Sequence, residues 1–155
     1  MTEQKRLIDL LASARRETLA ALGDVNDLAM VYAESGWRVK DVLGHLAAWE
    51  REVLASLQAY HEQDEYTLGP EYVLDAYNEA TFERRKEYDP AQCRMDWGMV
   101  RRDLQFAVQE IAPDRLDGPV CYPWGAQGTV TDLIEEVIQH EAAHLKDILA
   151  AIHLT

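Results

Sequence analysis

The sequence predicts an all-α fold, an antiparallel four-helix bundle, and three observations support that prediction. Apolar residues recur every three or four positions along nearly the whole chain, which is the period of an α-helix. No segment shows the sustained alternation or the turn residues of a β-hairpin, so no sheet is expected. The chain has 155 residues, of which 48% are hydrophobic, and this is enough to bury a sizeable core without disulfides. We therefore expect one bundle domain over residues 1–155.

The first two helices are expected on either side of a loop that runs through residues 34–37. The first ends near Gly23, a residue type that commonly terminates helices. Its predicted apolar face consists of Leu7, Leu10, Leu11, Ala14, Thr18, Ala21 and Leu22. The second helix begins near Val39. Its predicted apolar face consists of Val42, Leu46, Trp49, Val53 and Leu57.

A third helical stretch follows Gly69 and Pro70, and a fourth follows Asp89 and Pro90. Asp before Pro is typical of an N-cap followed by the first helical position. The predicted apolar face after Pro90 consists of Trp97, Val100, Leu104, Val108 and Ile111. The pattern leaves open whether these stretches form one kinked helix or a main helix with an extra one.

The segment of residues 113–128, PDRLDGPVCYPWGAQG, is expected to be a long loop. Loops of this length in compact domains are often functional, and a lid over exposed core is an equally good interpretation. Thr129 is predicted to cap the last helix, with Asp132 three residues later. Leu133, Val137 and Ile148 mark its buried face.

The composition excludes several classes of partner. A formal net charge of −13 repels phosphate backbones and anionic lipid surfaces, so we expect neither nucleic acid nor membrane as a partner. No apolar run approaches the roughly 18 residues that span a bilayer, and the N-terminus lacks the apolar core of a signal peptide. Cys93 and Cys121 form no CxxC pair, which indicates free thiols in a reducing cytoplasm.

The motif that carries most chemical information is His140-Glu141-Ala142-Ala143-His144. It matches H-E-x-x-H, in which two imidazoles lie one helical turn apart and can bind one divalent metal ion. Extended zinc-protease motifs take a third ligand downstream, but Asp147 and Ala150 occupy the positions that would need Gly and His. A third ligand must therefore come from upstream, which speaks against a metalloprotease.

His45 is the upstream candidate, because it lies at the edge of the apolar face of the second helix. Alone, it is more often a hydrogen-bonded histidine at the edge of a core, and an isolated H-E-x-x-H also occurs by chance. Together, His45, His140 and His144 project inward from helices of a bundle, a usual place for metal sites. We predict that they form a three-histidine site with an open position, as catalytic metal sites have.

Two carboxylates are expected close to these histidines. Glu141 and Glu50 could each orient a ligand imidazole or serve as a base, or could simply pair with Lys or Arg at a helix edge. Of the two, Glu141 is the predicted catalytic residue. His61 and His153 are expected to be solvated and outside the site.

The stretch of residues 36–50, GWRVKDVLGHLAAWE, together with the Thr-capped last helix and its H-x-x-x-H, resembles the DinB-like (DinB/YfiT) superfamily, with the ClbS/DfsB branch most similar. The resemblance implies a four-helix bundle, often a homodimer, that binds a divalent metal, commonly zinc or nickel, through His45, His140 and His144. Some members of the superfamily are thiol-dependent S-transferases or isomerases. ClbS-like members are described as hydrolysing a reactive cyclopropane, and some relatives lack the metal.

Two functions are consistent with these features. The first is a divalent-metal-dependent enzyme for a small electrophilic substrate, acting by hydrolysis or thiol transfer, with the metal activating a nucleophile at neutral pH and Glu141 accepting its proton. Trp124, Tyr122 and Trp49 would then form the walls of a pocket, although aromatic residues are more often plain core. The alternative is a non-enzymatic bundle that sequesters a small molecule or only dimerises.

Overall fold

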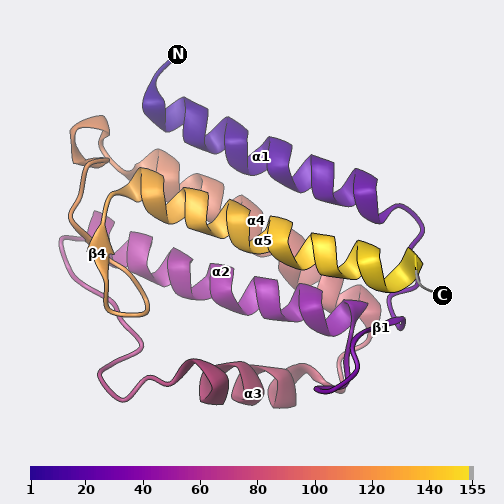
Figure 1. Ribbon diagram of the computed structural model, residues 1–155. Coiled ribbons are helices and arrows are strands. Elements are labelled where there is room, and N and C mark those ends of the chain that lie inside the picture. Colours follow the sequence, from indigo (N-terminus) through magenta and orange to yellow (C-terminus); the bar gives the residue numbers. More distant parts are fainter. Residues whose placement is uncertain (154–155) are drawn as a thin grey trace.

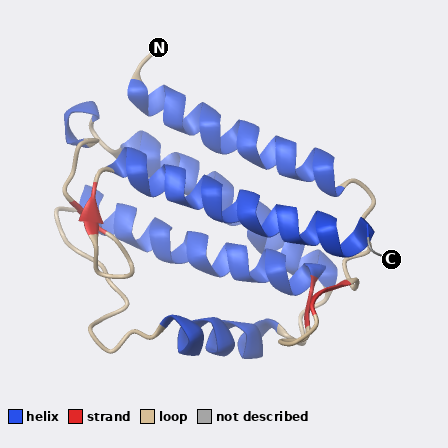
Figure 2. Cartoon of the chain, in the orientation of Figure 1, coloured by secondary structure: helices blue, strands red, loops and turns tan. Residues whose placement is uncertain are grey.

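The computed structural model describes residues 1–153, and these residues are mostly helical (Figures 1 and 2). The helices are α1 (Glu3–Leu22), α2 (Val39–His61), α3 (Leu74–Arg85), α4 (Pro90–Glu110) and α5 (Val130–His153). The all-α prediction is confirmed. Thr2 is the N-cap of α1, and Gly23, with a φ of 49°, ends it as expected.

The helix boundaries follow the local capping signals. The Asp89 carboxylate accepts a hydrogen bond from the Gln92 backbone N–H, so α4 begins at Pro90. Because α3 already ends at Arg85, the stretches around Pro90 form two separate helices. The Thr129 hydroxyl likewise accepts a hydrogen bond from the Asp132 N–H at the start of α5.

The prediction of a fold without hairpins is wrong in detail. Strands β1 (Met30–Tyr32) and β2 (Trp37–Arg38) pair antiparallel, and so do β3 (Val120–Cys121) and β4 (Gln127–Gly128). The loop of residues 113–128 contains the second pair and a 3₁₀ helix at Pro113–Arg115. These strands have two or three residues each, too few to produce a detectable alternation in sequence.

Four helices form the bundle, and α3 lies outside it. α2 packs against α4 and α5, α1 packs against the same two helices from the opposite side, and α3 covers the outer side of α2 (Figure 1). Because α2 is enclosed by α3, α4 and α5, every residue from position 39 to position 50 is buried. This enclosed half of α2 includes His45.

The core has two apolar clusters with a polar layer between them. Toward one end of the bundle, the main members are Leu7, Leu11, Val53, Leu57, Leu104, Val108, Leu133 and Ile134. Toward the other end they are Leu22, Val39, Val42, Leu46, Trp97, Val100 and Ile148. Between the clusters along each helix lie Arg15, Glu50, Arg101 and Glu141, one residue from each bundle helix and all nearly inaccessible to solvent.

None of the helices within residues 1–153 is both long and apolar enough to cross a membrane. Both cysteines are free thiols, with Cys93 buried and Cys121 half-buried.

Candidate metal centre

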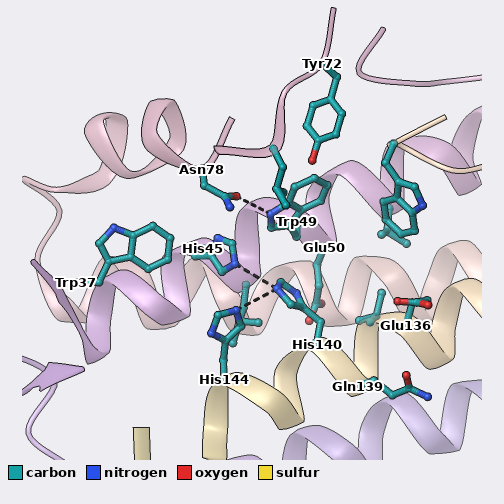
Figure 3. Close-up of a pocket in the computed structure, with 15 residues that line it drawn as sticks. Trp37, His45, Trp49, Glu50, Tyr72, Asn78, Glu136, Gln139, His140 and His144 are labelled. Atoms are coloured by element: carbon teal, nitrogen blue, oxygen red, sulfur yellow. Dashed lines mark hydrogen bonds between the residues drawn. The ribbon is translucent and has the colours of Figure 1, made fainter. Parts of the chain in front are cut away.

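Three imidazoles converge between α2 and α5 (Figure 3). α2 presents His45, and α5 presents His140 and His144 one turn apart on the face toward α2. The Nε2 atom of His140 lies 3.2 Å from Nε2 of His45 and 3.1 Å from Nε2 of His144. One nitrogen from each residue lies within 4.8 Å of the other two. The sequence prediction that a histidine about a hundred residues upstream joins the pair is confirmed.

The donor set has the chemistry and spacing of a metal site. Imidazole nitrogens bind Zn²⁺ at about 2.0–2.1 Å, so two nitrogens on a tetrahedral ion are about 3.3 Å apart. The two measured separations are close to that value. Three protein ligands leave at least one coordination position for a further group, which is the arrangement of catalytic rather than structural zinc sites. His61 and His153 are exposed, as expected for residues outside the site.

The histidines are poised in the neutral form that binds metals. Burial, with a smaller contribution from the neighbouring His140 and His144, lowers the pKa of His45 to about 3. Burial and His144 lower the pKa of His140 to about 4, against the opposing effect of Glu141. The pKa of His144 is also lowered, mainly by burial. At neutral pH a metal ion would therefore not compete with protons for these nitrogens.

These pKa shifts predict how stability depends on pH. The unfolded chain protonates its histidines near pH 6.5, whereas His45 and His140 stay neutral in the native protein down to about pH 3 and 4. Below about pH 6.5 the unfolded state therefore binds more protons, and the free energy of unfolding of the metal-free protein falls as the pH is lowered. Urea unfolding of the wild type and of His45→Gln between about pH 7 and 5 measures this. The wild type should lose more stability than the variant over that range. Parallel curves would contradict the conclusion that His45 stays neutral in the native protein.

His144 is oriented by a chain of hydrogen bonds that the sequence did not indicate. The Tyr32 hydroxyl donates to Asp147 Oδ2 at 2.6 Å and lies 2.7 Å from His144 Nδ1. Because the single hydroxyl hydrogen points to Asp147, the Tyr32 oxygen accepts a hydrogen bond from Nδ1–H of His144. The Nε2 atom of His144 then carries its lone pair toward His140. Burial and the Asp147 contact raise the pKa of Tyr32, so the hydroxyl keeps its proton.

Tyr32→Phe should therefore weaken metal binding without unfolding the protein. The phenyl ring preserves the packing of Tyr32 against Trp37, but Nδ1 of His144 loses its acceptor. Loss of such a partner typically costs about 10–100-fold in metal affinity. Titration with Zn²⁺ in the presence of a competing chelator measures the change. Tyr72→Phe is the matched control, because the Tyr72 hydroxyl lies along the same cavity but outside this chain of hydrogen bonds. Equal affinities for the two variants would refute the role of Tyr32.

The three histidines form part of the wall of a cavity of about 780 Å³. Its other walls come from β2, α2, the segment before α3, α3, α5 and the loop between β3 and β4. The aromatic residues that line it are Trp37, Trp49, Tyr72 and Trp124. Trp49 meets Tyr72 and Trp124 edge to face, with ring centroids 6.0 and 6.2 Å apart. Trp49 and Trp124 are thus pocket walls, as predicted, whereas the third predicted wall, Tyr122, is buried in the core instead.

Glu141 pairs with Arg15, which was one of the two interpretations of this residue, but it is 1% exposed and so lies in the core and not at a solvated helix edge. Its Oε1 atom accepts hydrogen bonds from Trp97 Nε1 at 2.9 Å and Arg15 Nε at 3.1 Å, and its Oε2 atom accepts one from the Thr18 hydroxyl at 3.0 Å. Glu141 is also absent from the residues that line the cavity. It faces α1 and α4, away from the histidines on its own helix.

Glu50 pairs with arginine, which was one of the two interpretations of this residue. Arg15 Nη2 donates to Glu50 Oε1 at 2.9 Å, and Arg101 donates to both oxygens of Glu50. Arg101 Nη2 is also 3.4 Å from Glu141 Oε1. Two arginines and two glutamates thus form a charge-balanced layer that links all four bundle helices at the level of the metal site.

The sequence reasoning missed Arg15 and Arg101, although a signal was present. Arg15 stands where the helical period would place an apolar residue. The buried series of α1 is Leu7, Leu11, Arg15, Thr18 and Leu22. Arg101 is similarly flanked by Val100 and Leu104 in α4. An arginine in an apolar stripe requires a buried acid as partner, and Glu50 and Glu141 were the two acids on inward faces.

A family model described as the DinB superfamily matches residues 7–148, which include all five helices in whole or in large part. No curated protein and no solved structure matches the chain significantly.

Proposed function

The chain belongs to the DinB superfamily, and on that basis we propose that it is a divalent-metal-dependent enzyme of the ClbS/DfsB type that acts on a small electrophilic substrate. The observation that carries this proposal is the cluster of His45, His140 and His144 in the wall of a cavity large enough for a small organic molecule. The reaction would be a hydrolysis or the transfer of a thiol.

In this proposal His45, His140 and His144 hold the metal, with zinc or nickel as the expected ion. When bound, a divalent ion at neutral imidazoles keeps its full positive charge and lowers the pKa of a coordinated water or thiol. The protein's own contribution is to keep the three imidazoles neutral by burial, to fix the tautomer of His144 through Tyr32, and to hold the substrate against the aromatic wall.

The lining of the cavity favours a neutral or positively charged substrate. No lysine or arginine is among the lining residues, whereas Glu136 contributes an exposed carboxylate one turn before His140. The charge of Glu50 is offset by Arg15 and Arg101. Four aromatic rings provide flat apolar surface for a planar or hydrophobic group. An anionic substrate would have only the metal to balance its charge.

The role of Glu141 as the catalytic base stays a prediction, and its contacts speak against it. Both of its oxygens accept hydrogen bonds from residues of α1 and α4, and Glu141 does not line the cavity from which the proton would come. We propose instead that Glu141 braces the site, because it ties the helix segment that carries His140 to α1 and α4. A homodimer and a cytoplasmic location are further parts of the proposal and rest on the family resemblance and the cysteine usage.

The test begins with metal analysis of protein purified without an affinity tag, followed by a screen of electrophiles with water or low-molecular-weight thiols as the nucleophile. The proposal expects about one divalent ion per chain and turnover that is lost after chelation and restored by metal. The metal-free protein and His140→Ala are the matched controls. Substrate binding without turnover in the metal-loaded protein would favour a sequestering protein, and a chain that binds no divalent metal would refute the proposal.

A further inference from the structure

Two buried side-chain nitrogens lack a hydrogen-bond partner among residues 1–153, and both belong to one small region between α2 and α3. They are Nδ1 of His45 and Nε of Arg85. His45 is only 7% exposed, so Nδ1 cannot reach bulk solvent. A buried donor without a partner costs about 1–3 kcal/mol, and two of them at one place call for a shared explanation.

His45 and Arg85 line the same cavity. Its volume is about 10 Å³, and its other walls include Asp41, Thr81 and the ring of Trp37. This volume is near the lower limit of about 10–15 Å³ that holds a single water molecule, and it is too small for a larger ligand. It shares only Trp37 and His45 with the lining of the larger cavity, so it is a separate space.

We propose that one ordered water molecule occupies this small cavity and links His45 Nδ1 to Arg85 and Asp41, so that Arg85 and Asp41 position the imidazole of His45 for the metal. The inference rests on the proposed metal site. When Nε2 of His45 faces a metal, Nδ1 carries the hydrogen and donates. The water oxygen accepts from Nδ1–H and from Nε–H of Arg85. Its two hydrogens are directed to the Asp41 carboxylate and the Thr81 hydroxyl oxygen, which completes four hydrogen bonds.

Neighbouring residues hold Asp41 in place and leave room for Arg85 at the wall of this small cavity. Asp41 is held in place because its oxygens accept from the Arg38 backbone N–H at 2.9 Å and from Lys40 Nζ at 3.1 Å. Gly44 admits the arginine, since a Cβ there would lie 3.2 Å from Arg85 Cδ. A carboxylate in the wall disfavours a chloride or other anion in place of water. The result matches the His144 side, where Tyr32 and Asp147 perform the same task by direct contact.

The first experiment is a crystal structure of the metal-free wild-type protein at a resolution that shows ordered water. The proposal expects one well-ordered water within hydrogen-bond distance of both His45 Nδ1 and Arg85 Nε. A dry cavity, or a direct contact of either atom with another protein group, would overturn it. This readout does not depend on metal binding, so it stands even if the proposed function fails.

The second experiment tests positioning through Arg85→Met, with Arg84→Met as the matched control. Arg84 is the exposed neighbour, so its loss removes the same charge without touching the cavity. Arg85→Met should weaken Zn²⁺ binding about 10–100-fold relative to Arg84→Met. Thr81→Val, which removes one acceptor of the proposed water and the hydrogen bond that the Thr81 hydroxyl donates to the Asn78 carbonyl oxygen, should weaken it less. Circular dichroism confirms that each variant is folded. Equal Zn²⁺ affinities for the two arginine variants would refute the positioning role. A wild type that binds no Zn²⁺ would instead refute the proposed function.

Discussion

His140→Ala is expected to abolish stoichiometric metal binding while the bundle stays folded. His140 is the central member of the cluster, since its Nε2 is the atom that lies 3.2 Å from His45 and 3.1 Å from His144. Its removal leaves only two of the three imidazole nitrogens that would coordinate the metal. The loss of affinity should exceed the roughly 100-fold that a partner outside the coordination sphere can cost.

The fold should survive because His140 belongs to neither apolar cluster and to no ion pair of the polar layer. Most helical stability in such a protein comes from the packing of apolar faces. Metal content by elemental analysis and helicity by circular dichroism measure the two effects separately. His61→Ala, at the exposed end of α2, is the control and should keep the metal. Wild-type metal content in the His140 variant would exclude the three-histidine site.

Arg101→Met is expected to cause a large loss of stability, because it removes a buried charge from the polar layer. Arg101 is 2% exposed and donates to Glu50, to the Leu11 carbonyl oxygen and, at longer distance, to Glu141. Its loss leaves two buried carboxylates with only Arg15 to balance them. Breaking a buried ion pair by removing one partner typically costs about 3–5 kcal/mol.

Urea unfolding of the metal-free protein measures this loss, and Arg102→Met provides the control. Arg102 is the exposed neighbour on the same helix, so its replacement should change the free energy of unfolding by no more than about 0.5 kcal/mol. Adding Glu50→Gln to Arg101→Met restores the charge balance and should recover part of the stability. If the Arg101 and Arg102 variants are equally stable, the layer does not hold the helices together as described.

Signals in the sequence determined the helices and the members of the histidine cluster. Asp89-Pro90 and Thr129 set helix starts through contacts within three residues, so no tertiary information was needed. The spacing of His140 and His144 follows from helix geometry alone. His45 could be predicted because it lies at the edge of an apolar stripe on a helix that must face the bundle. The short strands and the position of α3 were not accessible in this way, because two-residue pairings and an outer helix leave little periodic signal.

Only the tertiary structure decided which neighbouring helices each polar side chain faces. Consecutive residues on a helix are rotated by about 100°, so the step from His140 to Glu141 turns the side chain from α2 toward α1 and α4. The sequence placed both residues near one stripe, but only the packing of α5 between its neighbours separates a candidate metal ligand from a partner of Arg15. Tyr32 contacts His144 from β1, and Arg85 of α3 lines a small cavity together with His45; both elements approach only after the chain has folded back on α2 and α5. Such contacts depend on the relative position of whole elements, a quantity that no local pattern of residues encodes.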